Sequence, residues 1–398
     1  MSHAGASCAG GSIQDDPVTI RIPFNRPFIV GKELSYIAEA VANGQIAADG
    51  VYTKLCSRFL EERFAVPRVL LTPSCTAALE MAAILCDLGP GDEVIMPSYT
   101  FVSTASAVVR TGARPVFVDI RPDTLNLDEA KIEEALGPRT KMIVPVHYAG
   151  VACEMDTIMG IAAAHGLRVV EDAAQAVHGY YKGRALGSLG HFGAYSFHET
   201  KNFICGEGGA LCVNDAACIR RAEIVRDKGT NRQQYFRGEI DKYTWVDVGS
   251  SYVPSEISAA FLWAQLEHLE PITSRRQAIF QRYREALSPL EAAGLLRLPR
   301  IPAECQTNFH MFYILLPTPD LRDRLMAHLK SVGILSVFHY VPLHNSPLGE
   351  KLGCARRELP VTVDVSPRLL RLPFYFGLSA DEQGEVIEGI TRFLRERA

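Results

Sequence analysis

The 398-residue sequence lacks the patterns that mark several large classes of protein. It has no apolar run of the roughly 18 residues that a membrane-spanning helix requires. Its charge is nearly balanced, with 45 acidic and 41 basic residues and a formal net charge of −4, so no positive excess favours nucleic acid or an anionic membrane surface. It shows no internal repeats. We therefore expect a globular protein with neither a nucleic-acid nor a membrane partner.

Short motifs for common cofactors are also missing. A P-loop and the zinc motif H-E-x-x-H do not occur, and neither glycine-rich segment, 89–91 or 206–208, continues as the dinucleotide fingerprint G-x-G-x-x-G. The ten cysteines include no C-x-x-C pair, so we expect no metal site and no redox dithiol. Cys86 and Cys212 lie in apolar segments, where a free thiol is typical of a reducing compartment. These features predict a cytoplasmic protein.

The first 20 residues differ from the rest. Residues 1–17 are rich in Gly, Ala and Ser and lack the basic start and the apolar run of a signal peptide. We predict a disordered tail over residues 1–20.

Short apolar runs alternate with longer Ala-, Leu- and Met-rich stretches between Val69 and Val213. This alternation predicts a mostly parallel sheet with helices on both faces. The last two runs are joined by the glycine-rich turn 206–209 and by no helix, so the sheet is expected to be mixed at one edge. The predicted strands are 69–71, 93–96, 115–119, 142–146, 168–172, 193–197 and 210–213, and the clearest helices between them are 76–86 and 155–165.

The C-terminal part has a different pattern. A long helical stretch over 255–292 is expected to be interrupted at Pro271 and broken near Pro289. An apolar run at 309–316 and helices at 321–330 and 381–395 predict a smaller α+β domain. We place the large domain at residues 32–265 and the small domain at residues 21–31 and 266–398.

Lys201 and Asp172 together point to an aldehyde cofactor. An amine that forms a Schiff base with such a cofactor needs a carboxylate that keeps the cofactor's ring nitrogen protonated, so that the ring can accept electrons. Asp172 ends a buried strand-like run, where open α/β sheets place ligands, and Lys201 closes the segment S-F-H-E-T-K. Taken singly, each residue has a simpler role, the lysine as a surface charge and the aspartate as a turn former.

Two strand-to-helix junctions are candidate parts of the same site. Cys75 and Thr76 begin a helix, whose free N–H groups and dipole favour a phosphate group. Ordinary helix capping by Ser74 or Thr76 is the alternative. At the second junction, Phe101 could stack on a flat ring or, with Tyr99, simply fill the core.

Several longer segments resemble the sugar aminotransferases of the DegT/StrS family. The resemblance runs from residue 22 to the C-terminus and implies an α/β fold of type I, like that of aspartate aminotransferase, with pyridoxal 5'-phosphate as cofactor and nucleotide-linked keto sugars as substrates. The segments that carry it are T-P-S-C-T-A-A-L (72–79), P-S-Y-T-F-V-S-T (97–104), V-V-E-D-A-A-Q (169–175), S-F-H-E-T-K-N (196–202), G-E-G-G-A (206–210), H-Y-V-P-L-H (339–344) and L-R-L-P (370–373).

The resemblance implies roles for individual residues. Lys201 would form the Schiff base and Asp172 would pair with the ring nitrogen. Phe101 would stack on the ring, Gln175 would contact the ring hydroxyl, and the phosphate would be held by Cys75, Thr76 and Ser196. As substrate-binding candidates we name His147, His198, Arg232 and His339, although a structural role is the simpler account of His147 and His198.

Within the family, segments 144–159 and 227–232 resemble those of the enzymes that make dTDP-4-amino-4,6-dideoxygalactose. This implies amine transfer from L-glutamate to dTDP-4-keto-6-deoxyglucose. The gluco epimer, a 3-amino sugar, and a lyase or dehydratase on the same fold remain alternatives. The basic segment 220–242 is expected either to support a diphosphate or to form an ordinary solvated surface.

The family also implies a homodimer with shared active sites. One departure affects it: Val253 stands where many relatives have an asparagine that reaches the partner's phosphate. Ser251 or Tyr252 is the expected replacement.

Overall fold

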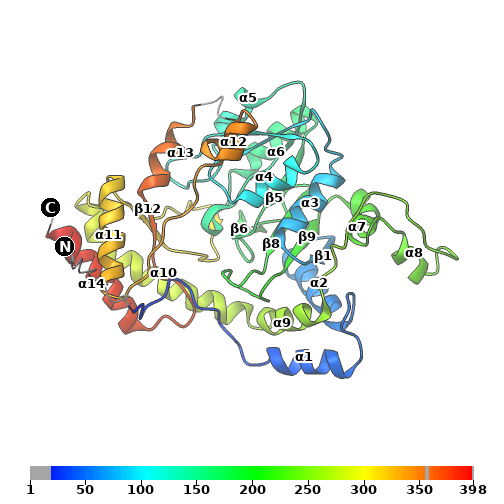
Figure 1. Ribbon diagram of the computed structural model, residues 1–398, viewed down its shortest axis with the longest axis horizontal. Helices are drawn as coiled ribbons and strands as arrows, with labels where there is room; N and C mark the ends of the chain where they lie inside the picture. Colours follow the sequence, from blue (N-terminus) through cyan, green and yellow to red (C-terminus); the bar gives the residue numbers. More distant parts are fainter. Residues whose placement is uncertain (1–18, 355–357, 397–398) are drawn as a thin grey trace, which may run out of the picture.

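The computed structural model describes residues 19–354 and 358–396, so the predicted disordered tail lies almost entirely outside the described residues. A seven-stranded sheet forms the centre of the molecule (Figure 1). All seven predicted strands are present, each within a few residues of its expected position. They are β1 (Arg68–Thr72), β2 (Glu93–Pro97), β3 (Arg114–Val118), β4 (Thr140–Ile143), β5 (Arg168–Asp172), β8 (Phe192–Ser196) and β9 (Gly209–Val213).

The strand order, β1-β9-β8-β5-β4-β2-β3, explains where the site lies. Only β9 runs antiparallel, pairing with β1 on one side and β8 on the other. The mixed edge predicted from the turn at 206–209 is therefore confirmed. All the other strands point the same way, so their carboxyl ends meet at one edge of the sheet.

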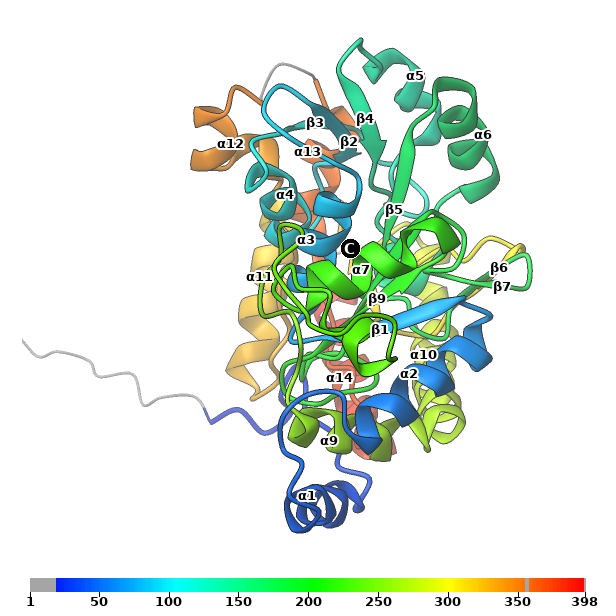
Figure 2. The same ribbon diagram turned by 90° about the vertical axis from the view of Figure 1, so that its right-hand side faces the viewer.

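Helices cover both faces of the sheet because apolar residues alternate along each strand. In β1, Val69 and Leu71 face one buried cluster and Leu70 faces the other. Figure 2 shows the helices of the two faces on opposite sides of the strands. The first cluster contains α2 (Val51–Phe64), α5 (Ile132–Ala135), α6 (Met155–His165) and α9 (Glu256–Leu266), which also packs against α1 (Glu33–Ala42); the second contains α3 (Cys75–Leu85), α4 (Val102–Val109) and α7 (Ile219–Arg226).

The C-terminal part builds a third buried cluster, which also contains Ile22 from the N-terminal segment. Figure 1 shows α11 and α14 together at one end of the molecule. The elements of this cluster are α10 (Leu269–Ala292), β11 (Tyr313–Leu315), α11 (Pro319–Ser331), β12 (Leu369–Arg371) and α14 (Ala380–Arg395). The division into two domains at the residues given above stays a prediction.

The remaining elements are short. They are β6 (Tyr180–Tyr181), β7 (Arg184–Ala185), β10 (Cys305–Gln306), α8 (Arg232–Phe236), α12 (Pro347–Lys351), α13 (Pro360–Val365) and the 3-10 turns η1 (Glu129–Lys131), η2 (Tyr148–Gly150), η3 (Ala216–Cys218), η4 (Leu343–Asn345) and η5 (Ser366–Arg368). Within the described ranges, no helix combines the length and the apolar character needed to cross a membrane.

The two prolines of the long helical stretch do not act as predicted. The break falls at residues 267–268, between α9 and α10, and Pro271 lies in the first turn of α10, where its missing N–H has no intrahelical partner to lose. Pro289 lies inside α10, which continues to Ala292. The hydroxyl of Ser288 donates a hydrogen bond of 2.9 Å to the carbonyl of Glu285, the group whose helical donor Pro289 removes.

Candidate active site

A cavity of about 670 Å³ opens at the edge where the parallel strands end. The β1–α3 and β2–α4 junctions, the end of β5 and the loop after β8 form one wall, and residues 337–340 and 371–374 form another. All seven residues predicted to bind the cofactor line this cavity: Cys75, Thr76, Phe101, Asp172, Gln175, Ser196 and Lys201.

Lys201 lies in the loop that joins β8 to β9. Its backbone N–H donates to the carbonyl of His198 at 2.9 Å, which closes a tight turn. Burial lowers the pKa of Lys201 below its ordinary value, while the negative charge of Asp172 partly opposes this shift. A lowered pKa increases the fraction of uncharged amine, the form that attacks an aldehyde.

Asp172 is the last residue of β5 and is 5% exposed. Its carboxylate accepts a hydrogen bond of 2.7 Å from the hydroxyl of Thr104 and one of 3.2 Å from the backbone N–H of Ala174. Thr104 in turn shares a hydrogen bond with Thr100. The carboxylate is thus held in one orientation at the cavity wall, where it can pair with a protonated ring nitrogen.

The N-terminus of α3 has the chemistry of a phosphate site. Ser74 caps the helix by accepting a hydrogen bond of 3.1 Å from the N–H of Ala77, as the alternative interpretation expected, but this uses only one of the free N–H groups. The hydroxyls of Thr76 and Ser103 share a hydrogen bond of 2.7 Å beside the cavity. Burial raises the pKa of the Cys75 thiol well above its usual range, so Cys75 contributes its backbone N–H and a neutral side chain.

A glycine keeps this helix end close to the sheet. A Cβ atom on Gly209, the first residue of β9, would lie 2.4 Å from the backbone nitrogen of Cys75. Only glycine therefore allows β9 to pass under the proposed phosphate site.

Phe101 and Gln175 suit a flat aromatic ring. The side chain of Phe101 is 56% exposed although it lines the cavity, so its ring face is accessible to a ligand. The amide oxygen of Gln175 accepts a hydrogen bond of 2.7 Å from the N–H of Ala149, and its nitrogen donates one of 2.7 Å to the hydroxyl of Tyr340. These contacts fix the amide and leave it a second N–H for a ring hydroxyl.

The substrate-binding candidates are only partly brought together. His198 and His339 line the cavity. His147 is fully buried outside it, with Nε2 2.8 Å from the carboxylate of Glu171 and Nδ1 accepting from the N–H of Cys153, so its role is structural. Arg232 also lies outside the cavity, with its guanidinium 5.0 Å from the ring of Phe236.

The basic segment 220–242 does not form a free diphosphate site. Most of its cations pair with nearby carboxylates and Arg226 is buried, so the segment offers no cluster of free cations to a diphosphate. The pairs are Arg220–Glu239, Arg221–Asp87, Arg221–Asp247, Arg226–Asp49, Lys228–Asp227, Arg232–Asp227, Arg237–Glu223 and Arg237–Glu239. The tyrosine next to Val253 already has a partner in its own chain. The Tyr252 hydroxyl donates a hydrogen bond of 3.1 Å to Glu80, which leaves Ser251 as the candidate for a contact with a partner subunit.

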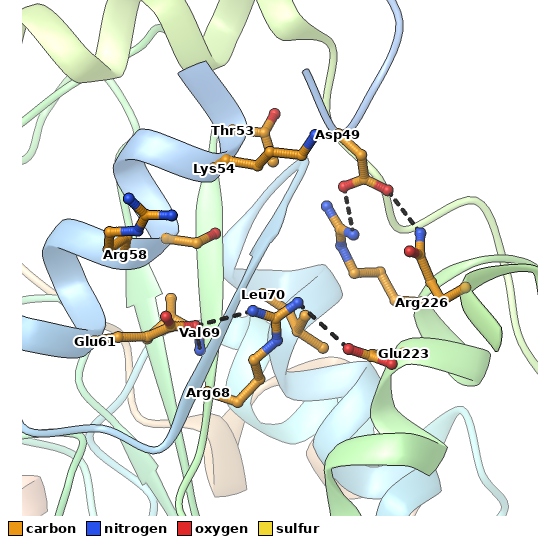
Figure 3. Close-up of a pocket in the computed structure, with 12 residues that line it drawn as sticks. Asp49, Thr53, Lys54, Arg58, Glu61, Arg68, Val69, Leu70, Glu223 and Arg226 are labelled. Carbon is orange, nitrogen blue, oxygen red and sulfur yellow. Dashed lines mark hydrogen bonds and ion pairs between the residues drawn. The ribbon is translucent and has the colours of Figure 1, made fainter. Parts of the chain in front are cut away.

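A second cavity, of about 240 Å³, lies between α2, β1 and the segment around Arg226 (Figure 3). Asp49 contacts Arg226 at 2.8 Å, and Arg68 lies 3.3 Å from both Glu61 and Glu223. Its three carboxylates are thus already paired with cations, and it contains none of the predicted site residues.

Four residues in or next to the first cavity were missed from the sequence. Thr104, behind the cavity wall, orients Asp172; Tyr340 holds Gln175; and Arg371 and Phe24 form part of the opposite wall. Three of them lie in motifs that carried the family resemblance, and Phe24 lies at its N-terminal end. The sequence signal that could have found them is that these motifs contain polar and aromatic residues to which no role had been assigned.

The fold and this cavity are those of a pyridoxal phosphate enzyme of fold type I, in which a partly buried lysine and a buried strand-end aspartate line a cavity beside a helix N-terminus. The comparisons with known proteins agree. The sequence model of the DegT/DnrJ/EryC1/StrS aminotransferase family matches residues 27–391, and the chain belongs to this family. The predicted family, fold and cofactor, pyridoxal 5'-phosphate, are confirmed.

Three relatives illustrate the similarity. The spore coat polysaccharide biosynthesis protein SpsC of Bacillus subtilis is 33% identical over 380 residues, which are 93% of this chain and 96% of SpsC. The crystal structure of the aminotransferase TlmJ from Streptoalloteichus hindustanus superposes with a TM-score of 0.86 at 30% identity and covers 95% of this chain and 100% of TlmJ. NtdA from Bacillus subtilis, solved with bound PMP, has a TM-score of 0.84 at 28% identity and covers 94% of this chain and 86% of NtdA.

Proposed function

We propose that this aminotransferase moves the amino group of L-glutamate to the C4 ketone of dTDP-4-keto-6-deoxyglucose and so makes dTDP-4-amino-4,6-dideoxygalactose. The observation that carries the proposal is the meeting of Lys201 and Asp172 in one cavity beside the N-terminus of α3. A cavity of about 670 Å³ supports a ligand larger than the cofactor alone.

Bound pyridoxal phosphate supplies an electron sink for the negative charge that develops on the carbon next to the transferred nitrogen. Asp172 keeps the ring nitrogen protonated, because an opposite charge at about 4 Å contributes roughly 4 kcal/mol at an effective dielectric constant near 20. The N-terminus of α3 and Ser196 would hold the phosphate, and Phe101 would pack against the ring.

Lys201 moves the proton. Its amine would take a proton from the α-carbon of the amino donor in the first half of the reaction and would deliver a proton to C4 of the sugar in the second half. The side of C4 that receives the proton sets the configuration of the product.

The sugar is proposed from the motif resemblance in segments 144–159 and 227–232. The name of SpsC, a polysaccharide biosynthesis protein, supports a carbohydrate pathway. The test is to incubate the purified protein with pyridoxal phosphate, L-glutamate and dTDP-4-keto-6-deoxyglucose, and to measure NMR coupling constants of the purified product. An axial amine at C4 is the expected result.

Each other result points to a stated alternative. An equatorial C4 amine indicates the gluco epimer, and an amine at C3 indicates a 3-amino sugar. Loss of water or of a substituent from the sugar without transfer of nitrogen from glutamate indicates a lyase or dehydratase.

We also propose that two copies form a homodimer with shared active sites. Ser251 is exposed and precedes α9, while its neighbour Tyr252 is anchored in its own chain. The Ser251 hydroxyl is therefore available to reach the phosphate site of a partner subunit.

A further inference from the structure

The second cavity, of about 240 Å³, has more cations than carboxylates in its lining. It lies at the edge of the sheet, where β1 has no neighbouring strand on one side. Figure 3 shows the cations on different sides of the cavity. The charged lining residues are Lys54, Arg58, Arg68 and Arg226 against Asp49, Glu61 and Glu223. Glu223 also pairs at 2.8 Å with Arg237, which is not part of the lining, so the cavity has a positive excess.

Two of these cations have no partner. Lys54 and Arg58 are exposed and lie four residues apart on α2, so their side chains project from the same face of the helix. Neither forms an ion pair with a carboxylate of the described residues. Like charges at this spacing destabilise a helix. An anion in the cavity would remove that repulsion.

Two buried polar groups of the same cavity also lack partners. Arg226 is 5% exposed. Its Nε donates to the carbonyl of Leu71 and its Nη1 to Asp49, each at 2.8 Å, but its Nη2 donates to none of the described residues. Ser57 is 9% exposed, and its hydroxyl forms no hydrogen bond within the described part of the chain. Buried donors without an acceptor are costly, so both groups favour a ligand that accepts hydrogen bonds.

We propose that this cavity binds a phosphate group, at a site separate from the cofactor cavity. The cations come from three elements, α2, β1 and α7, and surround the cavity, which suits the oxygen atoms of a tetrahedral phosphate better than a planar carboxylate. A metal cation is disfavoured because each carboxylate of the lining already pairs with an arginine. The volume is below the roughly 300–1,000 Å³ typical of sites for whole small molecules, so the cavity admits inorganic phosphate or one phosphate group of a larger ligand.

The position of the site predicts an effect on stability. A bound phosphate would join α2, β1 and α7, and a ligand that binds only the folded chain stabilises it. The backbone carbonyl of Arg226 also accepts a hydrogen bond of 3.1 Å from the N–H of Tyr252, next to Ser251. We therefore expect inorganic phosphate to raise the melting temperature of the cofactor-loaded protein and to steady the segment that contains Ser251.

The test titrates inorganic phosphate into the cofactor-loaded protein by calorimetry at constant ionic strength, so that the cofactor already occupies the phosphate site at α3. Ser57→Ala and Arg58→Gln alter the second cavity, and Ser106→Ala on α4 and Arg284→Gln on α10 are matched controls. We expect each cavity variant to weaken phosphate binding at least about tenfold, the effect of losing one hydrogen bond to a charged group, and neither control to change it. Melting temperature and cofactor content, measured without phosphate, show whether each variant is folded.

A parallel titration with dTDP identifies the source of the phosphate group. If Ser57→Ala and Arg58→Gln also weaken dTDP binding, a nucleotide carries the phosphate; if they weaken only inorganic phosphate, the ligand is the free ion. Two results would overturn the inference: no binding of inorganic phosphate to the wild-type protein at millimolar concentrations, or binding that both cavity variants leave unchanged, which would place the ion elsewhere.

Discussion

The hydroxyl of Thr104 donates a hydrogen bond of 2.7 Å to the carboxylate of Asp172, which joins the first turns of α4 to the end of β5. A carboxylate held by a neutral donor keeps its negative charge available for a ring nitrogen. Two substitutions therefore test this interaction: one removes the carboxylate's charge, and the other removes only the hydrogen bond that orients it.

Asp172→Asn should keep the bound cofactor and lose about three orders of magnitude in rate, because a neutral amide does not stabilise a protonated ring nitrogen. Thr104→Val should lose about tenfold, since a hydrogen bond to a charged group contributes about 1.5–3 kcal/mol. Steady-state rates at saturating substrates measure both, with Ser106→Ala on the same helix as the control. A rate for Asp172→Asn close to that of wild type would show that the carboxylate is structural.

Lys201→Ala should abolish turnover and the visible absorption of the lysine-bound cofactor, because no other amine of the described residues lines the cavity. Absorption spectra and an amine-transfer assay measure the two effects. Lys242→Ala, in the exposed segment after α8, is the control. Full activity in Lys201→Ala would rule out the proposed chemistry.

The reaction of Lys201 with added cofactor should depend on pH. The uncharged amine reacts, and burial holds the pKa of Lys201 below its ordinary value of 10.5, so the rate of reconstitution of the apoprotein should rise with pH and level off below that value. The positive charge of Arg371 lowers this pKa and the negative charge of Asp172 raises it. The midpoint should therefore move to higher pH in Arg371→Gln and to lower pH in Asp172→Asn. Stopped-flow absorbance across pH measures the midpoint of the reconstitution rate. An unchanged midpoint in both variants would show that the rate does not follow the titration of Lys201.

Glu256 should be important for stability. Glu256 is 1% exposed. Its carboxylate caps the N-terminus of α2 by accepting hydrogen bonds from the backbone N–H groups of Gly50, Tyr52 and Thr53. It also accepts one from the hydroxyl of Thr53. Glu256→Ala should lower the free energy of unfolding by about 3 kcal/mol. Denaturant unfolding measures this change, and Glu285→Ala on the exposed side of α10 should have little effect. Equal stability of the two variants would show that the cap is dispensable.

The homodimer is tested by sedimentation velocity and by assays at decreasing protein concentration. We expect one dimeric species and a weaker affinity for pyridoxal phosphate in Ser251→Ala, because the serine hydroxyl would contact the partner's phosphate group. A monomer that remains fully active at low concentration is the contrary result.

Asp172 lies in the cavity and His147 does not, although both were predicted at the site, and the reason is geometric. Asp172 is the last paired residue of β5, so the alternation of the strand directs it away from Glu171. Val146 bridges Asp172 in parallel register and also lines the cavity, so the same alternation turns the next residue, His147, to the opposite face, where it contacts Glu171. Position near a strand end predicted both residues to lie at the site, but only the local backbone decided which side each one faces.

The sequence by itself determined the alternating strands and helices, the mixed edge of the sheet and the residues predicted to bind the cofactor, because periodicity and short motifs act over a few neighbouring residues. Only the tertiary structure decided that Phe24 and Arg371 form one wall of the cavity, that Glu256 caps α2, and that the basic segment 220–242 is paired with carboxylates. These contacts join residues far apart in the chain. Their partners are set by how the segments pack, which no local pattern records.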